Sequence, residues 1–227
     1  MATAAAAPVA FSLRRATPAD ASAAAAFGRA AFCATFAHLY SAADLARYLD
    51  GIYTAPRFEA WARDPRMLVA LAEEQQGDSS IVGWALAGPV ELPHAEARPA
   101  VDGELRKLYV AEAVKGRGVA RALLDASVDF LRSPRRHSIV SDGGGDGGGD
   151  GGGRALGEGA SAPPPPSAPL PRVYLGVWSE NARAISFYKK NGFVVVGSYV
   201  PEGWAGLPLD GAPQGAARLD CELIMRL

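Results

Sequence analysis

The stretch from Glu104 to Leu131 constrains the fold most, because it combines a strand, a glycine turn and an amphipathic helix. Residues 104–110 place apolar side chains among charged ones and end on the β-favouring pair Tyr109 and Val110, which predicts a strand. From Val119 to Leu131 apolar residues recur at helical spacing, which predicts a helix with one apolar face. This stretch is therefore a strand–turn–helix unit.

The turn of this unit has the features of an anion-binding loop. It leads into a helix N-terminus, where the first amide groups lack acceptors and the helix dipole is positive. Gly116 and Gly118 permit tight turns and let a ligand approach the backbone closely. Three basic residues add positive charge at the same end: Lys115, Arg117 and Arg121. The turn predicts a phosphate or pyrophosphate ligand; the alternative is an ordinary strand–helix connection with solvated basic residues.

Two blocks resemble motifs of one known family. The Rossmann and P-loop glycine spacings are absent. The turn instead resembles the acetyl-CoA-binding motif of the GNAT N-acetyltransferase superfamily, Gln/Arg-x-x-Gly-x-Gly/Ala, with Lys115, Gly118 and Ala120 at the matching positions. Lysine stands where the family usually has glutamine or arginine. Residues 175–193 resemble the family's strand followed by an Asn-x-x-Ala-x-x-x-Tyr-x-x-x-Gly-Phe helix.

The resemblance implies where acetyl-CoA, the expected cosubstrate, would bind. In this family the central strand bulges and separates from its neighbour, and pantetheine pairs with the exposed backbone. By position Leu108, Tyr109 and Val110 would supply that backbone, with an N–H near Val110 facing the developing oxyanion. Asn181 matches the residue that helps to hold the pantetheine arm. The pyrophosphate cradle would consist of Lys115, Gly116, Arg117, Gly118, Val119 and Ala120.

The second block also contains the candidate general acid. Asn181, Ile185 and Tyr188 are spaced i, i+4 and i+7, which places them on one face of the predicted helix. Tyr188 stands at the family's tyrosine position, which implies that it protonates the coenzyme A sulfur. The alternative is a core aromatic residue beside Phe187.

The candidate general base is Glu104, at the start of the central strand. Its placement before the basic turn resembles that of the base glutamate in the histone-acetylating branch of the superfamily. Glu91 is a second candidate, and another carboxylate or a water relay is a further alternative. Surface charge and substrate recognition are the alternative roles for a glutamate at this position.

Composition restricts the other possibilities. The 227 residues allow a single domain at 11–227, after a disordered alanine-rich tail at 1–10. A net charge of −1 gives no overall attraction to nucleic acid or anionic membranes, and no apolar run approaches the ~18–20 residues of a membrane span. Neither the two cysteines nor the three histidines form a metal-ligand pattern. We therefore expect a cytoplasmic monomer or homodimer without metal, nucleic acid or membrane partners.

The domain is interrupted at 134–171. Nine of the eleven residues at 143–153 are glycine, and six of the nine at 163–171 are proline. Such a composition cannot bury enough apolar surface to offset its ordering entropy, so we predict a flexible insertion. A docking segment for proline-binding domains is the alternative.

The order of the predicted strands and helices suggests an α/β fold with one mixed central β-sheet flanked by helices, as in the GNAT superfamily. Further segments, among them GELRKLYV, GVWSEN and DCELIMRL, resemble the PaiA-type spermidine/spermine acetyltransferases. This implies transfer of acetyl to a small primary amine such as a polyamine, held by acidic and aromatic groups near Phe36, His38, Tyr40 and Asp44. Two alternatives are a non-catalytic acyl-CoA-binding or sensing module and a protein N-acetyltransferase.

Overall fold

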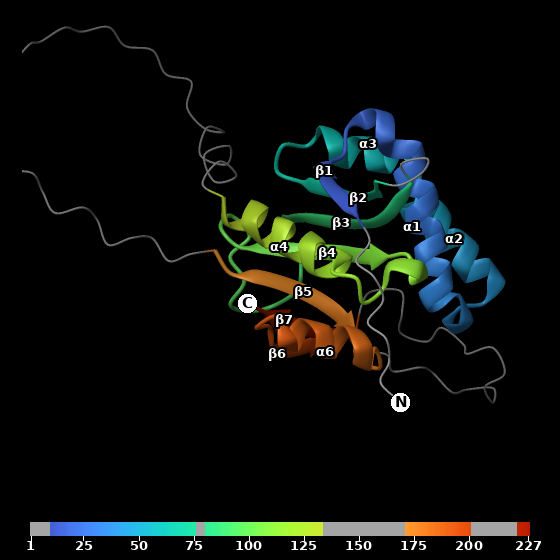
Figure 1. Ribbon diagram of the computed structural model, residues 1–227. Helices are drawn as coiled ribbons and strands as arrows, with labels where there is room; N and C mark the ends of the chain where they lie inside the picture. Colours follow the sequence, from blue (N-terminus) through green and yellow to red (C-terminus); the bar gives the residue numbers. More distant parts are fainter. Residues whose placement is uncertain (1–9, 76–79, 134–170, 201–221) are drawn as a thin grey trace, which may run out of the picture.

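The computed structural model describes residues 10–75, 80–133, 171–200 and 222–227 (Figure 1). The tail predicted at 1–10 lies outside the described residues except for Ala10. The insertion predicted at 134–171 lies outside them except for Pro171. The described residues contain one seven-stranded sheet flanked by helices.

The sheet is mixed, as the sequence predicted. Its strand order is β1-β2-β3-β4-β5-β7-β6. All neighbours pair antiparallel except β4 and β5, which are parallel. The strands are β1 (Phe11–Arg15), β2 (Leu68–Glu74), β3 (Ile81–Pro89), β4 (Gly103–Val110), β5 (Val173–Trp178), β6 (Val194–Tyr199) and β7 (Glu222–Arg226).

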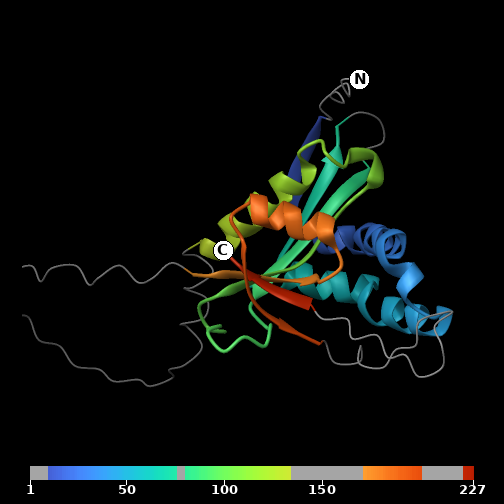
Figure 2. The same cartoon turned by 90° about the horizontal axis from the view of Figure 1, so that it is seen from below.

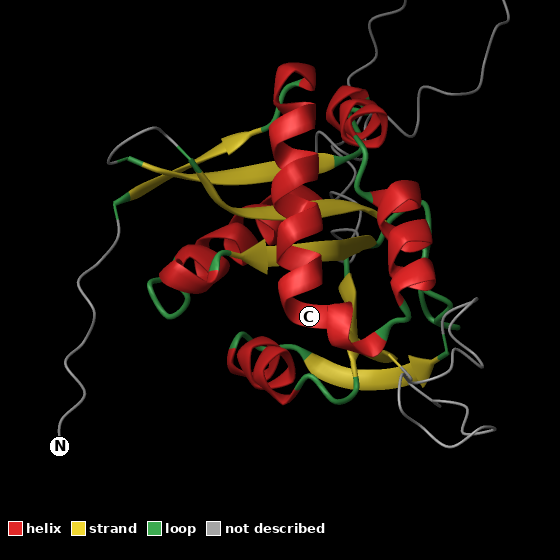
Figure 3. Cartoon of the chain, turned by 90° about the vertical axis from the view of Figure 1, so that its right-hand side faces the viewer, coloured by secondary structure: helices red, strands yellow, loops and turns green. Residues whose placement is uncertain are grey.

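Helices cover both faces of the sheet. Helices α1 and α3 pack on one face, and α4 packs on the other, against β2, β3 and β4. Figure 2 shows α4 and α6 on one side of the strands and α1–α3 on the opposite side, and Figure 3 shows the strands between helices. The α-helices are α1 (Ala21–Phe36), α2 (Ala42–Ile52), α3 (Ala55–Arg63), α4 (Val119–Arg132) and α6 (Ala182–Lys190); short 3-10 turns span Pro18–Asp20, Ala37–Leu39 and Glu112–Val114.

Local sequence signals explain where the first helices begin. Thr17 and Asp20 form a capping box, in which the Thr17 amide donates to the Asp20 carboxylate at 2.7 Å, although a 3-10 turn precedes α1. The Ser41 hydroxyl accepts from the Asp44 amide at 3.2 Å and caps α2. Hydroxyl and carboxylate side chains next to the first turns therefore fix where these helices begin.

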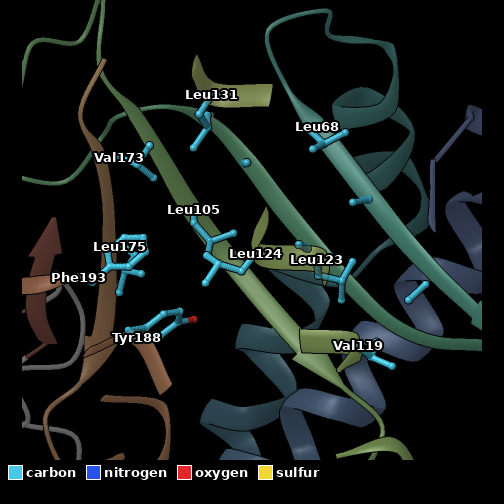
Figure 4. Packing of buried hydrophobic residues seen from close by; sticks show 14 of the residues in the cluster. Leu68, Leu105, Val119, Leu123, Leu124, Leu131, Val173, Leu175, Tyr188 and Phe193 are labelled. Atoms are coloured by element: carbon cyan, nitrogen blue, oxygen red, sulfur yellow. The ribbon is translucent and has the colours of Figure 1, made fainter. Parts of the chain in front are cut away.

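The apolar face predicted for α4 is buried against the sheet (Figure 4). Val119, Leu123, Leu124 and Leu131 are at most 2% exposed and share one core cluster with Leu105 of β4. Burying such side chains contributes about 1.5–3 kcal/mol each. This packing fixes the start of α4, and with it the preceding turn, relative to β4.

The centre of the sheet opens between β4 and β5. In the pairing of β3 with β4, Leu86 faces Lys107 and Ala87 faces Leu105, so Arg106 is the extra residue of a β-bulge. Strand β4 pairs with β5 only over Gly103–Leu105. The remainder of β4 thus presents backbone groups that β5 does not pair, and both the bulge and the separation implied by the resemblance are present.

Candidate active site

A cavity of about 800 Å³ lies where β4 and β5 separate. Its walls come from the unpaired part of β4, the end of β5, the turn before α4, and α6. Side chains of α1, α2, β6 and β7 close the opposite end. The strand separation therefore brings together residues from most of the chain.

Most of the predicted cofactor-binding residues line this cavity. They are Leu108, Tyr109, Val110, Lys115, Gly116, Gly118, Ala120 and Asn181. Arg117 and Val119 are not among the lining residues. The Val119 side chain is fully buried in the core cluster beneath α4, so only its backbone is available to a ligand.

The glycines of the turn are required by backbone conformation. Gly116 and Gly118 have φ angles of 80° and 89°, in the region that favours glycine. A Cβ atom added at either position would meet nothing within 4 Å, so space is not the reason. Gly118 is the N-cap of α4, and the open surface around both glycines leaves the helix N-terminus accessible to an anion.

Positive charge at the turn is only partly neutralised. Lys115 forms an ion pair with Glu112. Arg121 binds Asp125 at 2.7 Å and donates to the Asn191 side-chain oxygen at 2.5 Å. These contacts lie at the surface, where ion pairs are weak and exchangeable. The turn therefore fits the diphosphate of a nucleotide such as coenzyme A.

Tyr188, on α6, lines the cavity together with residues of β4. Its side chain is 8% exposed, and its ring packs on Phe187 and Phe193, with centroids 5.3 and 5.7 Å away. In Figure 4 the ring lies beside Leu175 and Phe193, and its hydroxyl points away from them. Burial, with a smaller effect of Tyr109, raises the pKa of Tyr188 above its ordinary value. The hydroxyl thus keeps its proton at neutral pH and is able to donate it.

Glu104 lies in the same cavity, at the last paired part of β4. One oxygen of its carboxylate accepts hydrogen bonds from the Glu91 and Leu92 amides at 2.7 and 3.1 Å. Burial raises the pKa of Glu104, although these bonds and nearby Arg106 partly oppose the shift. A carboxylate held in this way accepts protons more readily than a solvated one. The second candidate base, Glu91, binds Arg106 with its side chain 70% exposed and is not among the lining residues.

The acceptor end differs from the sequence-based expectation. Of the four residues predicted there, only Phe36 lines the cavity. Tyr40 is buried behind the rings of Phe32 and Tyr48. The Asp44 carboxylate is occupied by the α2 cap and by Arg47, and His38 also lies away from the lining.

Other side chains form this end of the cavity instead. Sequence reasoning missed the aromatic residues Phe32, Tyr48, Trp178 and Tyr199 and the charged residues Lys107 and Glu222. The Tyr199 hydroxyl donates to the Glu222 carboxylate at 3.0 Å. Only Lys107 carried a usable signal, since strand alternation places it on the same face as Tyr109.

Neither a metal centre nor a membrane span is found in the part of the chain that the structure describes. Within it, no cluster of three or more histidine, cysteine or acidic side chains could hold a metal ion. No helix among these residues has the length and apolar character needed to cross a membrane.

A mixed sheet opened between its parallel strands, with a glycine turn at a helix N-terminus beside the opening, is the architecture of an acyl-CoA N-acyltransferase. Residues 64–195 match the family model of the acetyltransferase (GNAT) domain, and the chain belongs to this family. The protein is accordingly an N-acetyltransferase that uses acetyl-CoA.

Curated relatives and solved structures agree with this assignment. Uncharacterized N-acetyltransferases from Mycobacterium bovis and Mycobacterium tuberculosis are 29% identical over 154 residues, covering 68% of this chain and 70% of theirs. The fold is similar to that of the PaiA N-acetyltransferase from Thermoplasma acidophilum in complex with coenzyme A (TM-score 0.56, 16% identity, 96% of this chain and 98% of that one). It is equally similar to an N-acetyltransferase from Staphylococcus aureus Mu50 (TM-score 0.57, 16% identity, 96% and 98%). At such identities the likeness to these structures concerns the fold alone.

Proposed function

We propose that this protein transfers the acetyl group of acetyl-CoA directly to a primary amine of a small molecule within a ternary complex. The observation that carries the proposal is that Glu104, Tyr188 and the glycine turn line one continuous cavity. A candidate base, a candidate acid and an anion cradle in one cavity are what direct transfer requires.

The cofactor half of the cavity would hold coenzyme A mainly through the backbone. Amides of the 115–120 turn would bind the diphosphate, and the part of β4 that β5 leaves unpaired would bind the pantetheine. The Asn181 side-chain oxygen accepts from the Ala184 amide at 3.1 Å, which leaves the side-chain nitrogen to donate to the pantetheine. Substitutions of side chains in the turn should therefore weaken binding without abolishing it.

Glu104 and Tyr188 each carry out one of the two proton transfers in the reaction. Bound acetyl-CoA supplies the thioester carbonyl that the neutral amine attacks. Glu104 accepts the proton that the amine loses as the carbon–nitrogen bond forms, and a backbone N–H near Val110 stabilises the negative charge that develops on the carbonyl oxygen. Tyr188 donates its proton to the sulfur as the carbon–sulfur bond breaks. The raised pKa of Tyr188 keeps the proton on its hydroxyl, and the raised pKa of Glu104 makes its carboxylate a better proton acceptor.

The acceptor end is suited to a small amine. Aromatic side chains from α1 and α2 face carboxylates from β4 and β7 there. Both groups attract cations, which is compatible with the polyamine expected from the sequence. They suit other amines equally well. The choice among acceptors therefore depends on the other charged side chains at this end of the cavity.

Replacing Tyr188 tests the proposal. With thiol release measured over a panel of amines, Tyr188→Phe should lower kcat by ~10²-fold or more. The acetyl-CoA dissociation constant from calorimetry should stay within about twofold, because the ring and its packing remain. Tyr174→Phe is the matched control, since Tyr174 is buried outside the cavity lining. Unchanged turnover would remove Tyr188 from this role. Tight binding of coenzyme A without acetylation of any amine would favour a sensing module.

A further inference from the structure

We infer that the acceptor carries a carboxylate in addition to its amine, as an amino acid does, and that Lys107 binds this carboxylate. The inference rests on the proposed function and specifies its substrate class. It derives from the side chains that surround the lysine at the acceptor end of the cavity.

Lys107 faces the acceptor half of the cavity. On β4 it shares a face with Tyr109, whereas Leu108 between them packs in the cluster beneath α4. Its Nζ atom donates to the Tyr48 hydroxyl at 3.2 Å and lies 5.9 Å from the centre of that ring. Because Tyr48 belongs to α2, the ammonium group lies on the side of the sheet opposite α4 and its anion-binding turn. Lys107 is therefore placed to contact the acceptor.

The ammonium group has no ion-pair partner among the described residues. No carboxylate there lies within 4 Å of Nζ, although the side chain is half-buried among aromatic rings. Glu222 accepts from the Tyr199 hydroxyl, and Glu104 accepts from two backbone amides. A cation held away from water is costly unless something compensates it. The Tyr48 hydroxyl and the nearby charge of Glu222 supply part of that compensation. Because no carboxylate pairs with Nζ directly, the ammonium group can still form an ion pair with an anionic group of the ligand.

The lysine is charged when the ligand arrives. Burial alone lowers the pKa of Lys107, but the Tyr48 and Tyr109 hydroxyls and the Glu222 carboxylate together raise it above its ordinary value. Among the described residues, this end of the cavity presents the Lys107 ammonium group and the carboxylates of Glu104 and Glu222, while Arg106, which also lines the cavity, is paired with Glu91. This arrangement complements a molecule that carries both an amine and an acid. A polycation would place like charge beside Nζ, at a cost of about 1–4 kcal/mol for charges 4 Å apart.

Matched acceptors that differ only by the carboxylate test the inference. Steady-state kinetics would compare L-lysine with cadaverine and L-phenylalanine with phenethylamine, with spermidine as a polycation. We expect the acid-bearing member of each pair to have the higher kcat/KM, by about tenfold or more, the factor that a charge-assisted hydrogen bond provides. This comparison uses the native protein and does not depend on any variant.

Lys107→Met then assigns the effect to the residue. It should raise KM for the acid-bearing acceptors by about 10–100-fold, lower KM for spermidine because a like charge is removed, and leave KM for acetyl-CoA within about twofold. The matched control is Lys190→Met, which removes an exposed lysine at the end of α6. Lys107→Arg, which keeps the charge, should restore part of the preference.

The outcomes distinguish the inference about the acceptor from the proposed acetyltransferase function. Faster acetylation of cadaverine or spermidine than of L-lysine, or an equal effect of Lys107→Met on both members of a pair, would overturn the inference and leave the acetyltransferase intact. Acetylation of no amine in the panel would contradict the proposed function itself, and the inference with it.

Discussion

The Asp102 carboxylate accepts a hydrogen bond from the Arg172 amide, with 2.9 Å between Oδ1 and N. The Gly103 amide donates in turn to the Arg172 carbonyl oxygen at 2.9 Å. These contacts join the residues that precede β4 and β5. The two strands then pair over Gly103–Leu105 and separate. The opening between the two strands contains Glu104 and Tyr188. The Asp102–Arg172 contact therefore holds β4 and β5 together at the closed end of this opening.

Removing the Asp102 carboxylate should destabilise the protein strongly. The side chain is fully buried and also binds Arg98, with 2.6 Å between Oδ1 and Nη2. We expect Asp102→Ala to lower the free energy of unfolding by about 3 kcal/mol, the cost of breaking a buried charged network. Urea unfolding at pH 7 measures this. Asp50→Ala, which breaks only the exposed pair with Arg29, should change stability by less than ~1 kcal/mol.

Acid should reduce the difference between Asp102→Ala and the native protein. Burial opposes ionisation of Asp102, but hydrogen bonds from Arg98 and Arg172 outweigh it and hold the pKa of Asp102 below its ordinary value. A lowered pKa means that the contribution is complete above the unfolded value near 4 and is lost as the pH falls below it. The free energies of unfolding of Asp102→Ala and of the native protein, measured at pH 7 and at pH 3, should thus differ more at pH 7. A difference that grows on acidification would contradict this assignment.

Gly118→Ala should weaken cofactor binding through backbone strain alone. The φ angle of 89° is unfavourable for alanine by about 1–2 kcal/mol, although the added methyl group has open space around it. Because Gly118 caps α4 at the predicted diphosphate site, KM for acetyl-CoA should rise several-fold while the acceptor KM changes little. Gly51→Ala is the control, since Gly51 is helical and also has open space. That change should be neutral or stabilising, because alanine favours helix. Equal effects of both changes would exclude this role for Gly118.

Glu104→Gln should remove a proton acceptor without changing the shape of the cavity. We expect kcat/KM to fall by ~10²-fold. In the native protein, activity should decline as the pH falls through the raised pKa of Glu104, because the base must be ionised. The pH–activity profile of Glu104→Gln should lack this low-pH limb and keep the limb that protonation of the acceptor amine causes. Glu91→Gln, outside the cavity lining, should keep both limbs. An unaltered low-pH limb in Glu104→Gln would exclude Glu104 as the base.

Local patterns were sufficient to predict the strand, the turn and the helix start that line the cavity beside α4. The predicted strand at 104–110 and helix at 119–131 differ by one residue each from β4 (Gly103–Val110) and α4 (Val119–Arg132). Period, glycine placement and capping are properties of neighbouring residues, so a single sequence displays them. The turn between these elements could therefore be located from residues 115–120 alone.

The acceptor half could not be predicted in the same way. Glu222 and Tyr199 reach the cavity because β7 lies between β5 and β6, a strand order that chain order does not reveal. Which aromatic residues of α1 and α2 face the cavity depends on how these helices pack together. Tyr40 and Phe36 illustrate this, since the first is buried behind Phe32 while the second lines the cavity. Such contacts arise only from the assembled fold.

The described residues on either side of the segment at 134–171 lie close together. A Cβ atom on Gly103 would lie 2.7 Å from the Leu131 side chain near the end of α4, and the Gly103 amide binds the Arg172 carbonyl oxygen. Leu131 and Arg172 are thus both neighbours of Gly103, on either side of the segment. A linker of about eight glycine and serine residues, with a reach of roughly 25 Å, is long enough to join them.

Replacing residues 136–169 with such a linker should leave acetylation of a small amine unchanged within about twofold. Leu131 and Arg172, which flank the segment, lie beside Gly103 at the closed end of the opening, and the Asp102–Arg172 contact that closes β4 against β5 does not involve the segment. Steady-state kinetics on the shortened and the full-length chain, with unfolding curves for both, make the comparison. Full activity on the small amine would count against a protein acetyltransferase whose substrates dock on this segment. A large loss of kcat/KM in a stably folded shortened chain would instead make the segment part of the acceptor site, and acceptor selection would then depend on it as well as on Lys107.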